Sequence, residues 1–451
     1  MLEKNYDVII IGAGILGVSI GYFLASNTRS KIAIIEQEND VALHSSSRNT
    51  GKVHAPFLYD PHKKKFFAKS CSLGYDMWKK YTESKKLLFK EDGVIEIAKK
   101  DGDLETLNKY YKWGLENGLN EKEIKILEEK QINEIEPNIV CKSALLCKKD
   151  ASVNYFKLTK SLEEDNQQLG NHIFLSNKVI KITKNRNNKN KKINIEIINT
   201  VTKNILNISC NFLINAGGGN SLKIANSMGI ATEFINLHFK GEYWIAPDEY
   251  NHLTNHSIYT VPNNSKFPFL DPHWIKRVNG ICEIGPNALP VFSYDSYKFK
   301  RNIRNLIPKI KSIILKENFW KISTNKEFMK LVFSEFESSL FKHKMIGRVK
   351  DFLPDIDSRK FRNKGISGIR SPLINKEGEF APDTIIRKTE DSLHILNYNS
   401  PGATGSLPIS AMIVQDLIID SIVTKNRDQS EKYNGKKIWD IEEIHKKIKY
   451  E

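Results

Sequence analysis

A glycine-rich segment near the N-terminus constrains the fold more than any other feature of the chain. The sequence G-A-G-I-L-G at residues 12–17 follows an apolar run, 8–11, that is typical of a buried parallel strand. It opens an apolar stretch of helical length, 18–25, and Glu36 ends the next predicted strand, 31–35. Strand, glycine turn, helix, strand and acidic residue in this order predict a βαβ unit that binds a dinucleotide.

The spacing gives each residue of the unit a physical task. Gly12 permits the tight turn, Gly14 lets a pyrophosphate approach the backbone, and Gly17 lets the helix pack closely on the strand. The phosphates would lie on free N–H groups at the positive end of the helix dipole. Glu36 is placed to accept hydrogen bonds from an adenosine ribose, and its charge disfavours the 2′-phosphate of NADP. FAD and NAD both remain open at this point.

The strongly positive net charge would be consistent with nucleic-acid binding, but the distribution of the lysine and arginine residues does not support that function. The 451-residue chain carries a formal charge of +16, but lysine and asparagine gather in loops such as 184–192, without interleaved aromatic residues. A positive field can instead steer an anionic substrate or favour an anionic membrane surface. The length predicts a large core and two interleaved domains.

The cysteines and the apolar stretches indicate where in the cell the protein is expected. The five cysteines form no metal-binding or disulfide spacing, which is typical of reduced thiols in a cytoplasmic protein. The apolar stretch 8–25 is interrupted by the glycines and lacks a basic leader, so it is not expected to be a signal peptide. No other segment is expected to approach the ~18 apolar residues of a membrane span. We therefore expect no metal site and at most peripheral contact with the inner face of a membrane.

Hydrophobic periodicity predicts the remaining elements. Helices are expected at residues 64–85, 104–118, 121–131, 302–342 and 407–423. Strands are expected at 179–183, 193–198, 212–216 and 393–396, and an antiparallel sheet is expected between 235 and 291. Polar, glycine-containing segments at 44–51, 217–220 and 399–406 have the composition of loops that approach a bound dinucleotide.

Six further blocks of sequence carry a resemblance to a known family. They are S-R-N-T-G-K-V-H-A at 47–55 (similar to N-S-G-V-I-H-A-G), K-G-E-Y at 240–243 (R-G-E-Y), F-P-F-L-D-P-H at 267–273 (P-F-L-G-V-H), G-P-N-A at 285–288, G-I-R at 368–370 (G-V-R) and S-P-G-A-T at 400–404 (S-P-A-A-T). In order and spacing the chain resembles the FAD-dependent oxidoreductases of the D-amino-acid oxidase superfamily, and within them the L-2-hydroxyglutarate oxidases/dehydrogenases. The resemblance favours FAD over NAD, held without a covalent bond.

The resemblance implies an α/β fold in which a Rossmann-like FAD-binding domain is interleaved with an antiparallel-sheet substrate domain of α+β type. The expected segments are 1–90, 145–225 and 350–424 for the FAD-binding domain, 91–144 and 226–349 for the substrate domain, and 425–451 for a charged C-terminal tail.

Motif and resemblance together give a set of candidate site residues. The expected cofactor-binding residues are Gly12, Gly14, Ile15, Leu16, Gly17, Glu36, Ser46, Ser47, Arg48, Asn49, Thr50, Gly51, Val179, Ala216, Gly217, Gly402, Ala403, Thr404, Gly405 and Ser406. His54 matches the family's histidine and is the candidate base, because an imidazole with a pKa near 6.5 is mostly neutral at pH 7. Arg370 and Lys240 are the candidate cations for substrate carboxylates.

The resemblance implies FAD-dependent oxidation of L-2-hydroxyglutarate, or a similar 2-hydroxy acid, to the 2-oxo acid. The chain departs from the family blocks at Lys52, Pro56, Lys240 and 371–372, which keeps a different 2-hydroxy acid open. An amino-acid or amine oxidase of the same fold, and a non-catalytic FAD-binding assembly factor, are the alternatives. The electron acceptor (oxygen, a quinone or an electron-transfer protein) and the oligomeric state are not specified by the sequence.

Overall fold

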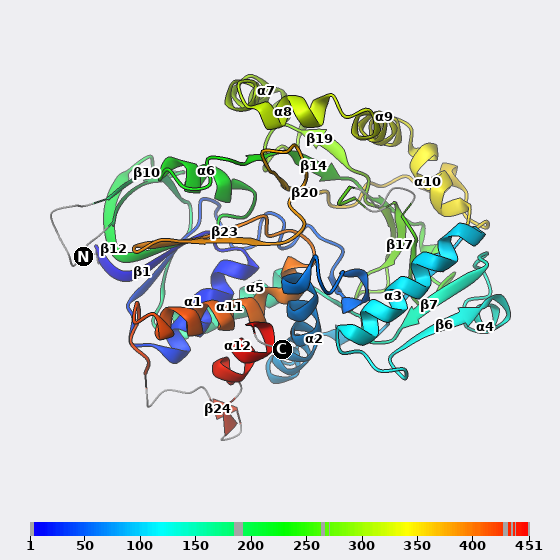
Figure 1. Cartoon of the computed structure of the whole chain (residues 1–451), viewed down its shortest axis with the longest axis horizontal. Coiled ribbons are helices and arrows are strands. Elements are labelled where there is room, and N and C mark those ends of the chain that lie inside the picture. The colour runs from blue at the N-terminus through cyan, green and yellow to red at the C-terminus, as the bar shows by residue number, and fades with distance from the viewer. Residues whose placement is uncertain are drawn as a thin grey trace.

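The computed structural model describes residues 4–184, 193–262, 267–269, 271–426, 432–433, 436–437 and 439–449. Figure 1 shows two parts side by side, a sheet flanked by long helices and a second sheet whose outer side carries a row of helices. Residues 185–192 of the predicted Lys/Asn-rich loop, and Leu270 of the F-P-F-L-D-P-H block, lie outside the described residues.

The first part is an eight-stranded mixed sheet. Its strands are β1(Asn5–Ile11), β2(Ile32–Ile35), β9(His172–Phe174), β10(Asn177–Lys184), β11(Ile193–Asn199), β12(Ile205–Asn215), β22(Ile385–Lys388) and β23(Ser392–Leu396). The main path runs β10-β11-β12-β1-β2-β9, and β23 pairs in parallel with β12. β1 pairs in parallel with both β2 and β12, and β2 is buried along its whole length. This is the parallel core that a dinucleotide-binding domain requires.

Long helices cover this sheet. They are α1(Ile15–Asn27), α2(Lys65–Lys85), α5(Tyr155–Gln168), α11(Gly402–Ile419) and α12(Ile441–Lys449), with the short α6(Ser221–Ser227) near the end of β12. The expectation that no second segment reaches the length of a membrane span is wrong, because α11 is long and apolar enough by composition. However, 78% of α11 is buried inside the protein, where it packs on α1, α2 and α12 as a core helix.

The second part contains a seven-stranded sheet in the order β15-β18-β17-β16-β5-β7-β6. These strands are β5(Val94–Ala98), β6(Ile124–Glu128), β7(Ser143–Cys147), β15(Trp244–Ile245), β16(Ser257–Thr260), β17(His273–Lys276) and β18(Cys282–Gly285). All neighbours pair antiparallel except β5 and β16. The mixed helix and sheet fold, with an antiparallel-type substrate part, is therefore confirmed.

Smaller pieces complete the structure. Short strands are β3(Lys52–Val53), β4(Phe89–Lys90), β8(Ala151–Val153), β13(Ile235–Asn236), β14(His238–Gly241), β19(Leu289–Val291), β20(Gly368–Arg370), β21(Leu373–Ile374), β24(Lys432–Tyr433) and β25(Lys436–Lys437). Further helices are α3(Leu104–Glu116), α4(Glu129–Ile135), α7(Phe299–Ile313), α8(Glu317–Ser323), α9(Lys326–Leu340) and α10(Lys342–Lys350). Single 3₁₀ turns lie at Pro56–Leu58, Asp101–Asp103, Gly218–Asn220, Asp248–Tyr250 and Ser358–Lys360.

Residues between 350 and 374 lie elsewhere than the expected segments suggest. Phe352 and Phe361 are fully buried in the same apolar cluster as Trp274 of the seven-stranded sheet. Strand β20 pairs with β14, and β21 pairs with β13. This stretch was assigned to the FAD-binding domain, but its large apolar side chains and its strands pack on the substrate part.

The C-terminal residues also form more than a charged tail. Ile441 and Ile448 of α12 are buried against α2 and α11. The indole of Trp439 donates to the hydroxyl of Tyr22 at 3.2 Å. Charged residues occupy the outer face of α12, while its apolar face extends the core of the first part.

Candidate active site

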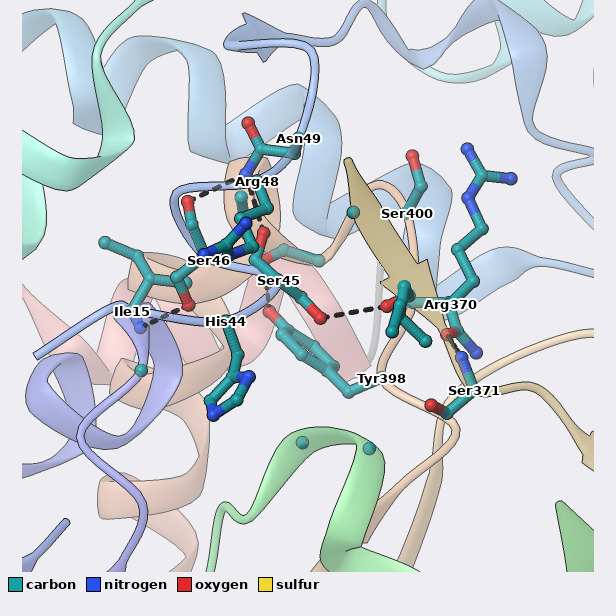
Figure 2. A pocket seen from close by; sticks show the side chains of 18 of the residues that line it. Ile15, His44, Ser45, Ser46, Arg48, Asn49, Arg370, Ser371, Tyr398 and Ser400 are labelled. Atoms are coloured by element: carbon teal, nitrogen blue, oxygen red, sulfur yellow. Dashed lines mark hydrogen bonds between the residues drawn. The ribbon is translucent and has the colours of Figure 1, made fainter. Parts of the chain in front are cut away.

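A single long pocket brings most of the predicted site residues together (Figure 2). Its cavity volume is about 290 Å³, and its wall comes from both parts of the molecule. The predicted residues that line it are Gly12, Gly14, Ile15, Leu16, Glu36, Ser46, Arg48, Asn49, Thr50, His54, Val179, Ala216, Gly217, Arg370, Gly402, Ala403 and Thr404.

Five predicted cofactor residues support this wall without lining the pocket. A Cβ on Gly17 would lie 1.9 Å from the carbonyl oxygen of Gly12, so Gly17 is needed for helix–turn packing. Ser47 donates to the carbonyl of Ala42 at 2.6 Å, and Ser406 donates to that of Ala403 at 2.9 Å. The other two are Gly51 and Gly405, where an added Cβ would meet Val153 and Ser70.

Lys240 is not brought to the pocket. Its neighbours Phe239 and Gly241 on β14 line the cavity, and side chains alternate between the faces of a strand. The Lys240 ammonium lies on the other face, where it pairs with the Glu242 carboxylate at 2.9 Å. The prediction that Lys240 binds a substrate carboxylate therefore finds no support in the geometry.

One end of the pocket has the features of an adenosine diphosphate site. The Glu36 carboxylate accepts hydrogen bonds from the backbone of Ala13 (2.8 Å) and Glu38 (3.0 Å), which fixes it at the pocket wall. Burial raises the pKa of Glu36 in spite of these bonds. Gly14 is the N-cap residue of α1 and has no side-chain cap, so the positive end of the helix faces the cavity.

The backbone at this end fits a dinucleotide. Gly12 has φ +103°, and a Cβ there would lie 2.6 Å from the Ala216 carbonyl oxygen, so only glycine fits. Ser46 accepts a hydrogen bond from the backbone N–H of Ile15 at 2.9 Å (Figure 2). The Ser46 hydroxyl thus lies beside the helix N-terminus where a pyrophosphate would bind.

The other end of the pocket gathers His54, Arg370, Tyr259 and His273. Burial, together with the charges of Lys52 and Arg370, lowers the pKa of His54 to about 3. Burial, with Arg370, lowers the pKa of His273 to about 3 as well. The rings of Tyr259 and His273 are 4.3 Å apart.

Several buried polar atoms at this end lack hydrogen-bond partners within the described residues. They are His54 Nδ1, the Tyr259 hydroxyl and His273 Nδ1. A buried polar atom without a partner is costly, so such atoms around a cavity fit a polar ligand. The residues present therefore fit FAD along one end of the pocket and an anionic substrate at the other.

A buried ionic cluster lies behind His54. The Lys52 ammonium is 3.0 Å from the Asp92 carboxylate and 3.8 Å from that of Asp150. The other oxygen of Asp150 is 3.8 Å from His54 Nδ1 and accepts from the backbone of Ala55 at 3.1 Å. Burial is the main reason that the pKa of Asp150 is raised to about 7, although Lys52 opposes it.

The sequence analysis did not predict most of the aromatic residues of the pocket wall. Five of these are Tyr59, Tyr243, Tyr259, His273 and Tyr398. Tyr243 and His273 lie within two of the family blocks, so these blocks could have been used to predict that both residues line the pocket. Tyr59, Tyr259 and Tyr398 have no local pattern that separates them from core tyrosines.

Comparison with known proteins assigns the family. The FAD dependent oxidoreductase family model matches residues 7–416. L-2-hydroxyglutarate dehydrogenase of Indibacter alkaliphilus is 30% identical over 91% of this chain and 98% of its own length. The mitochondrial L-2-hydroxyglutarate dehydrogenase of Dictyostelium discoideum is 32% identical over 91% of this chain and 92% of its own.

Solved structures agree on the fold. L-alpha-glycerophosphate oxidase from Mycoplasma pneumoniae superposes with a TM-score of 0.71 at 19% identity, covering 96% of this chain and 99% of that one. Glycine oxidase from Geobacillus kaustophilus gives a TM-score of 0.67 at 15% identity, covering 96% and 100%. Since the family match spans nearly the whole described chain and the pocket fits the cofactor, the chain belongs to the FAD dependent oxidoreductase family and is an enzyme that uses FAD.

Proposed function

We propose that this enzyme oxidises L-2-hydroxyglutarate, or a similar 2-hydroxy dicarboxylate, to the 2-oxo acid. The observation that carries the proposal is the meeting of His54 and Arg370 at the end of the pocket remote from Glu36. Oxidation of a 2-hydroxy acid by a flavin requires a base for the hydroxyl proton and a cation for the carboxylate. The names of the relatives at 30–32% identity support the choice of substrate.

FAD would be held along the pocket by the α1 N-terminus, Glu36, Ser46 and the start of α11. When bound, it supplies the acceptor for the hydride that leaves the substrate carbon. His44 lines the pocket and is the histidine at which a covalent bond to the flavin would be considered. Non-covalent binding is favoured, because both ring nitrogens of His44 already have partners. Nε2 is 3.0 Å from Glu38 and Nδ1 is 3.3 Å from the Tyr297 hydroxyl.

His54 would accept the proton of the substrate hydroxyl as the hydride departs, which leaves the carbonyl of the 2-oxo acid. Its lowered pKa keeps the imidazole neutral at pH 7, so the ring can accept a proton. A bound dianion brings negative charge next to the ring and offsets Arg370, which raises the pKa of His54 toward a more effective base.

Arg370 would bind a substrate carboxylate. It lines the pocket from β20, and one of its nitrogens donates to the carbonyl of Pro268 at 3.2 Å, which holds the side chain in place. A cation about 4 Å from a carboxylate gains about 4 kcal/mol at an effective dielectric of 20, before desolvation is subtracted. Guanidinium also binds carboxylate through two parallel hydrogen bonds, which orients the substrate.

The test is the anaerobic flavin spectrum of the purified holoenzyme before and after addition of L-2-hydroxyglutarate. We expect the oxidised flavin band to bleach, and Arg370→Met to raise the substrate concentration for half-maximal bleaching about 30-fold or more, from a net loss of about 2 kcal/mol. Lys240→Met is the matched control, because Lys240 faces away from the pocket, and it should change this concentration less than threefold.

Two results would contradict the proposal. Bleaching by an amino acid such as L-glutamate, but by no 2-hydroxy acid, would assign the amino-acid oxidase alternative. Equal effects of Arg370→Met and Lys240→Met would remove Arg370 from the site. The cytoplasmic location stays a prediction from the sequence.

A further inference from the structure

Large apolar side chains are exposed mainly in one place on the described surface. Nineteen large hydrophobic residues of the described chain are exposed, and eleven of them fall between residues 299 and 341. The eleven are Phe299, Ile303, Ile307, Ile310, Ile314, Leu315, Trp320, Phe333, Phe336, Leu340 and Phe341. We call this set the outer apolar surface. It includes every exposed phenylalanine and tryptophan of that count, and clustering of this kind marks an interaction site.

Helix α7 carries the largest share of this surface. Phe299, Ile303, Ile307 and Ile310 recur at intervals of three or four residues, so they lie on one face. Phe299 is 77% exposed and Ile307 is 64% exposed, and Leu315, just beyond the helix, is 93% exposed.

The polar residues of α7 hold this apolar face outward. The Lys309 ammonium points into the protein, where it donates to the backbone and side-chain oxygens of Asn236 at 2.5 and 2.8 Å. Asn302 accepts from the backbone of Phe292 at 2.8 Å. These two inward polar contacts orient the helix so that its apolar face points away from the protein, while Arg304 and Lys311 of the same helix are exposed beside that face.

Helices α8 and α9 continue the surface. Trp320 lies half exposed on α8, with its indole N–H donating to the Ile314 carbonyl at 2.8 Å. Phe333, Phe336 and Leu340 recur at intervals of three and four on α9, and all are exposed. In Figure 1 these helices form a row along the edge of the molecule opposite α1 and α12.

Charge surrounds the outer apolar surface. Residues 298–330 contain ten lysines and arginines and two glutamates, a net charge of +8 that is half of the +16 of the chain. Six of these lysines and arginines are exposed and form no ion pair within the described residues. They are Lys298, Lys300, Arg304, Lys311, Lys326 and Lys330. A cation that is already in an ion pair binds a further anion weakly, whereas these unpaired cations can bind an anionic partner.

We propose that the outer apolar surface docks on the interface of an anionic lipid bilayer. Phenylalanine, isoleucine, leucine and tryptophan side chains would enter the boundary between headgroups and acyl chains, while the surrounding lysines and arginines meet the lipid phosphates. A basic helix with one apolar face is the structure that lies in such an interface. A second copy of the chain is disfavoured, because the exposed cations around two such surfaces would repel each other.

The surface adjoins the pocket through a phenylalanine cluster. The ring of Phe328 on α9 packs 6.3 Å from that of Phe239, which in turn lies 4.5 Å from Phe269. Phe239 and Phe269 both line the cavity. Docking would therefore hold the substrate end of the pocket near the bilayer.

The test is co-sedimentation of the full-length holoenzyme with vesicles of phosphatidylcholine, alone or mixed with phosphatidylglycerol. We expect binding to the mixed vesicles at 0.1 M salt, at least tenfold stronger than to phosphatidylcholine alone, and loss of most of it at 0.5 M salt. Phe299→Ser, Ile307→Ser and Leu315→Ser combined should weaken binding at least tenfold while the flavin spectrum is retained.

Two comparisons keep the test specific. Leu88→Ser, Val201→Ser and Ile205→Ser combined remove three other strongly exposed apolar residues outside the outer apolar surface, and they should leave binding unchanged. Lys300→Glu, Arg304→Glu and Lys311→Glu combined should abolish the preference for phosphatidylglycerol. The proposal is overturned if the wild-type enzyme stays in the supernatant with both vesicles, or if both apolar triple variants bind alike. Self-association that only the first triple variant abolishes would assign the surface to a dimer instead.

Discussion

Asp150 shows how one buried side chain can set the behaviour of the proposed base. Its carboxylate lies 3.8 Å from His54 Nδ1, which is too far for a hydrogen bond but close enough for a strong charge interaction. If His54 accepts a proton on its other nitrogen, the ring becomes a cation and the Asp150 carboxylate stabilises it. Asp150 is thus a positioning and charge-stabilising residue that acts through His54.

We therefore expect Asp150→Asn to lower kcat about 10- to 100-fold and to change KM less than threefold, because the interaction gains strength only in the transition state. The pKa of Asp150 is raised to about 7, so its charged form appears as the pH rises through 7. The wild-type rate should rise over that range, and the variant should lose this limb. Asp92→Asn is the control, since Asp92 pairs with Lys52 at 3.0 Å and does not approach His54. Equal kcat losses in both variants, with unchanged pH profiles, would assign Asp150 a structural role only.

Short sequence motifs correctly predicted site residues whose contacts lie within the same motif. They failed for residues whose position depends on pairing with segments distant in the chain. Gly12, Gly17 and Glu36 act within one βαβ unit, so their spacing alone placed them. Lys240 was wrongly predicted to face the pocket. The pairing of β14 with β19 and β20 decides which side chains face the pocket, and it turns Lys240 toward Glu242. Tyr259 belongs to β16, and the pairing of β16 with β5, a segment distant in the chain, places it at the pocket.

The same division appears among the elements. Long periodic segments gave correct helices, as at α2 and α3, and apolar runs gave the central strands. Residues 121–131 were predicted as a charged helix, but 124–128 form strand β6, which pairs antiparallel with β7, and α4 starts only at Glu129. The buried Ile124 can join the sheet edge, and this pairing overrides the weak helical preference of the segment.

Helix α12 gives an element-scale prediction. Ile441, which is fully buried, is one of three isoleucines that attach the helix to α2 and α11. Ile441→Ala should destabilise the protein by about 2–4 kcal/mol and lower Tm by several degrees, because it leaves a cavity in the core. Lys446→Ala, at an exposed position of the same helix, should leave Tm unchanged. A Tm within one degree of wild type for Ile441→Ala would mean that the C-terminal helix is not docked in solution.

At the scale of the whole molecule, the two sheets meet around a pocket whose wall neither part could form alone. The three-stranded sheet β3-β8-β4 joins segments from residues 52, 89 and 151, and it carries His54 into the pocket. Interleaved segments of this kind bury polar and titratable residues in both parts. Their combined titration should be visible in the stability of the whole enzyme.

Four buried histidines, two buried acids and Lys309 have strongly shifted pKa values that govern the expected pH dependence of stability. Burial lowers the pKa of His54 and His273 to about 3, that of His394 to about 4, and that of His238 well below its usual value. Below pH 6.5 the unfolded chain binds protons at these histidines that the folded chain does not, so the free energy of unfolding falls as the pH falls. Burial raises the pKa of Asp150 to about 7 and that of Glu96 to about 8, so their stabilising contribution is lost as the pH rises from about 4 to those values. Burial also lowers the pKa of Lys309 to about 7, and the folded chain gains stability from this lysine as the pH rises above 7.

Since the histidines outnumber the acids, we expect a steep loss of stability from about pH 6.5 toward pH 5. Little change is expected between pH 7 and 8, where Lys309 offsets the acids. Each histidine contributes a slope that approaches about 1.4 kcal/mol per pH unit. Tm of the holoenzyme measured from pH 5 to 8 checks this. His394→Gln tests the cause, because His394 bonds Asn215 and Ser392 in the first sheet and does not line the pocket. The variant should lose stability at pH 7 but show a flatter acid limb, and a Tm that rises between pH 6.5 and 5 in the wild-type enzyme would refute the assignment.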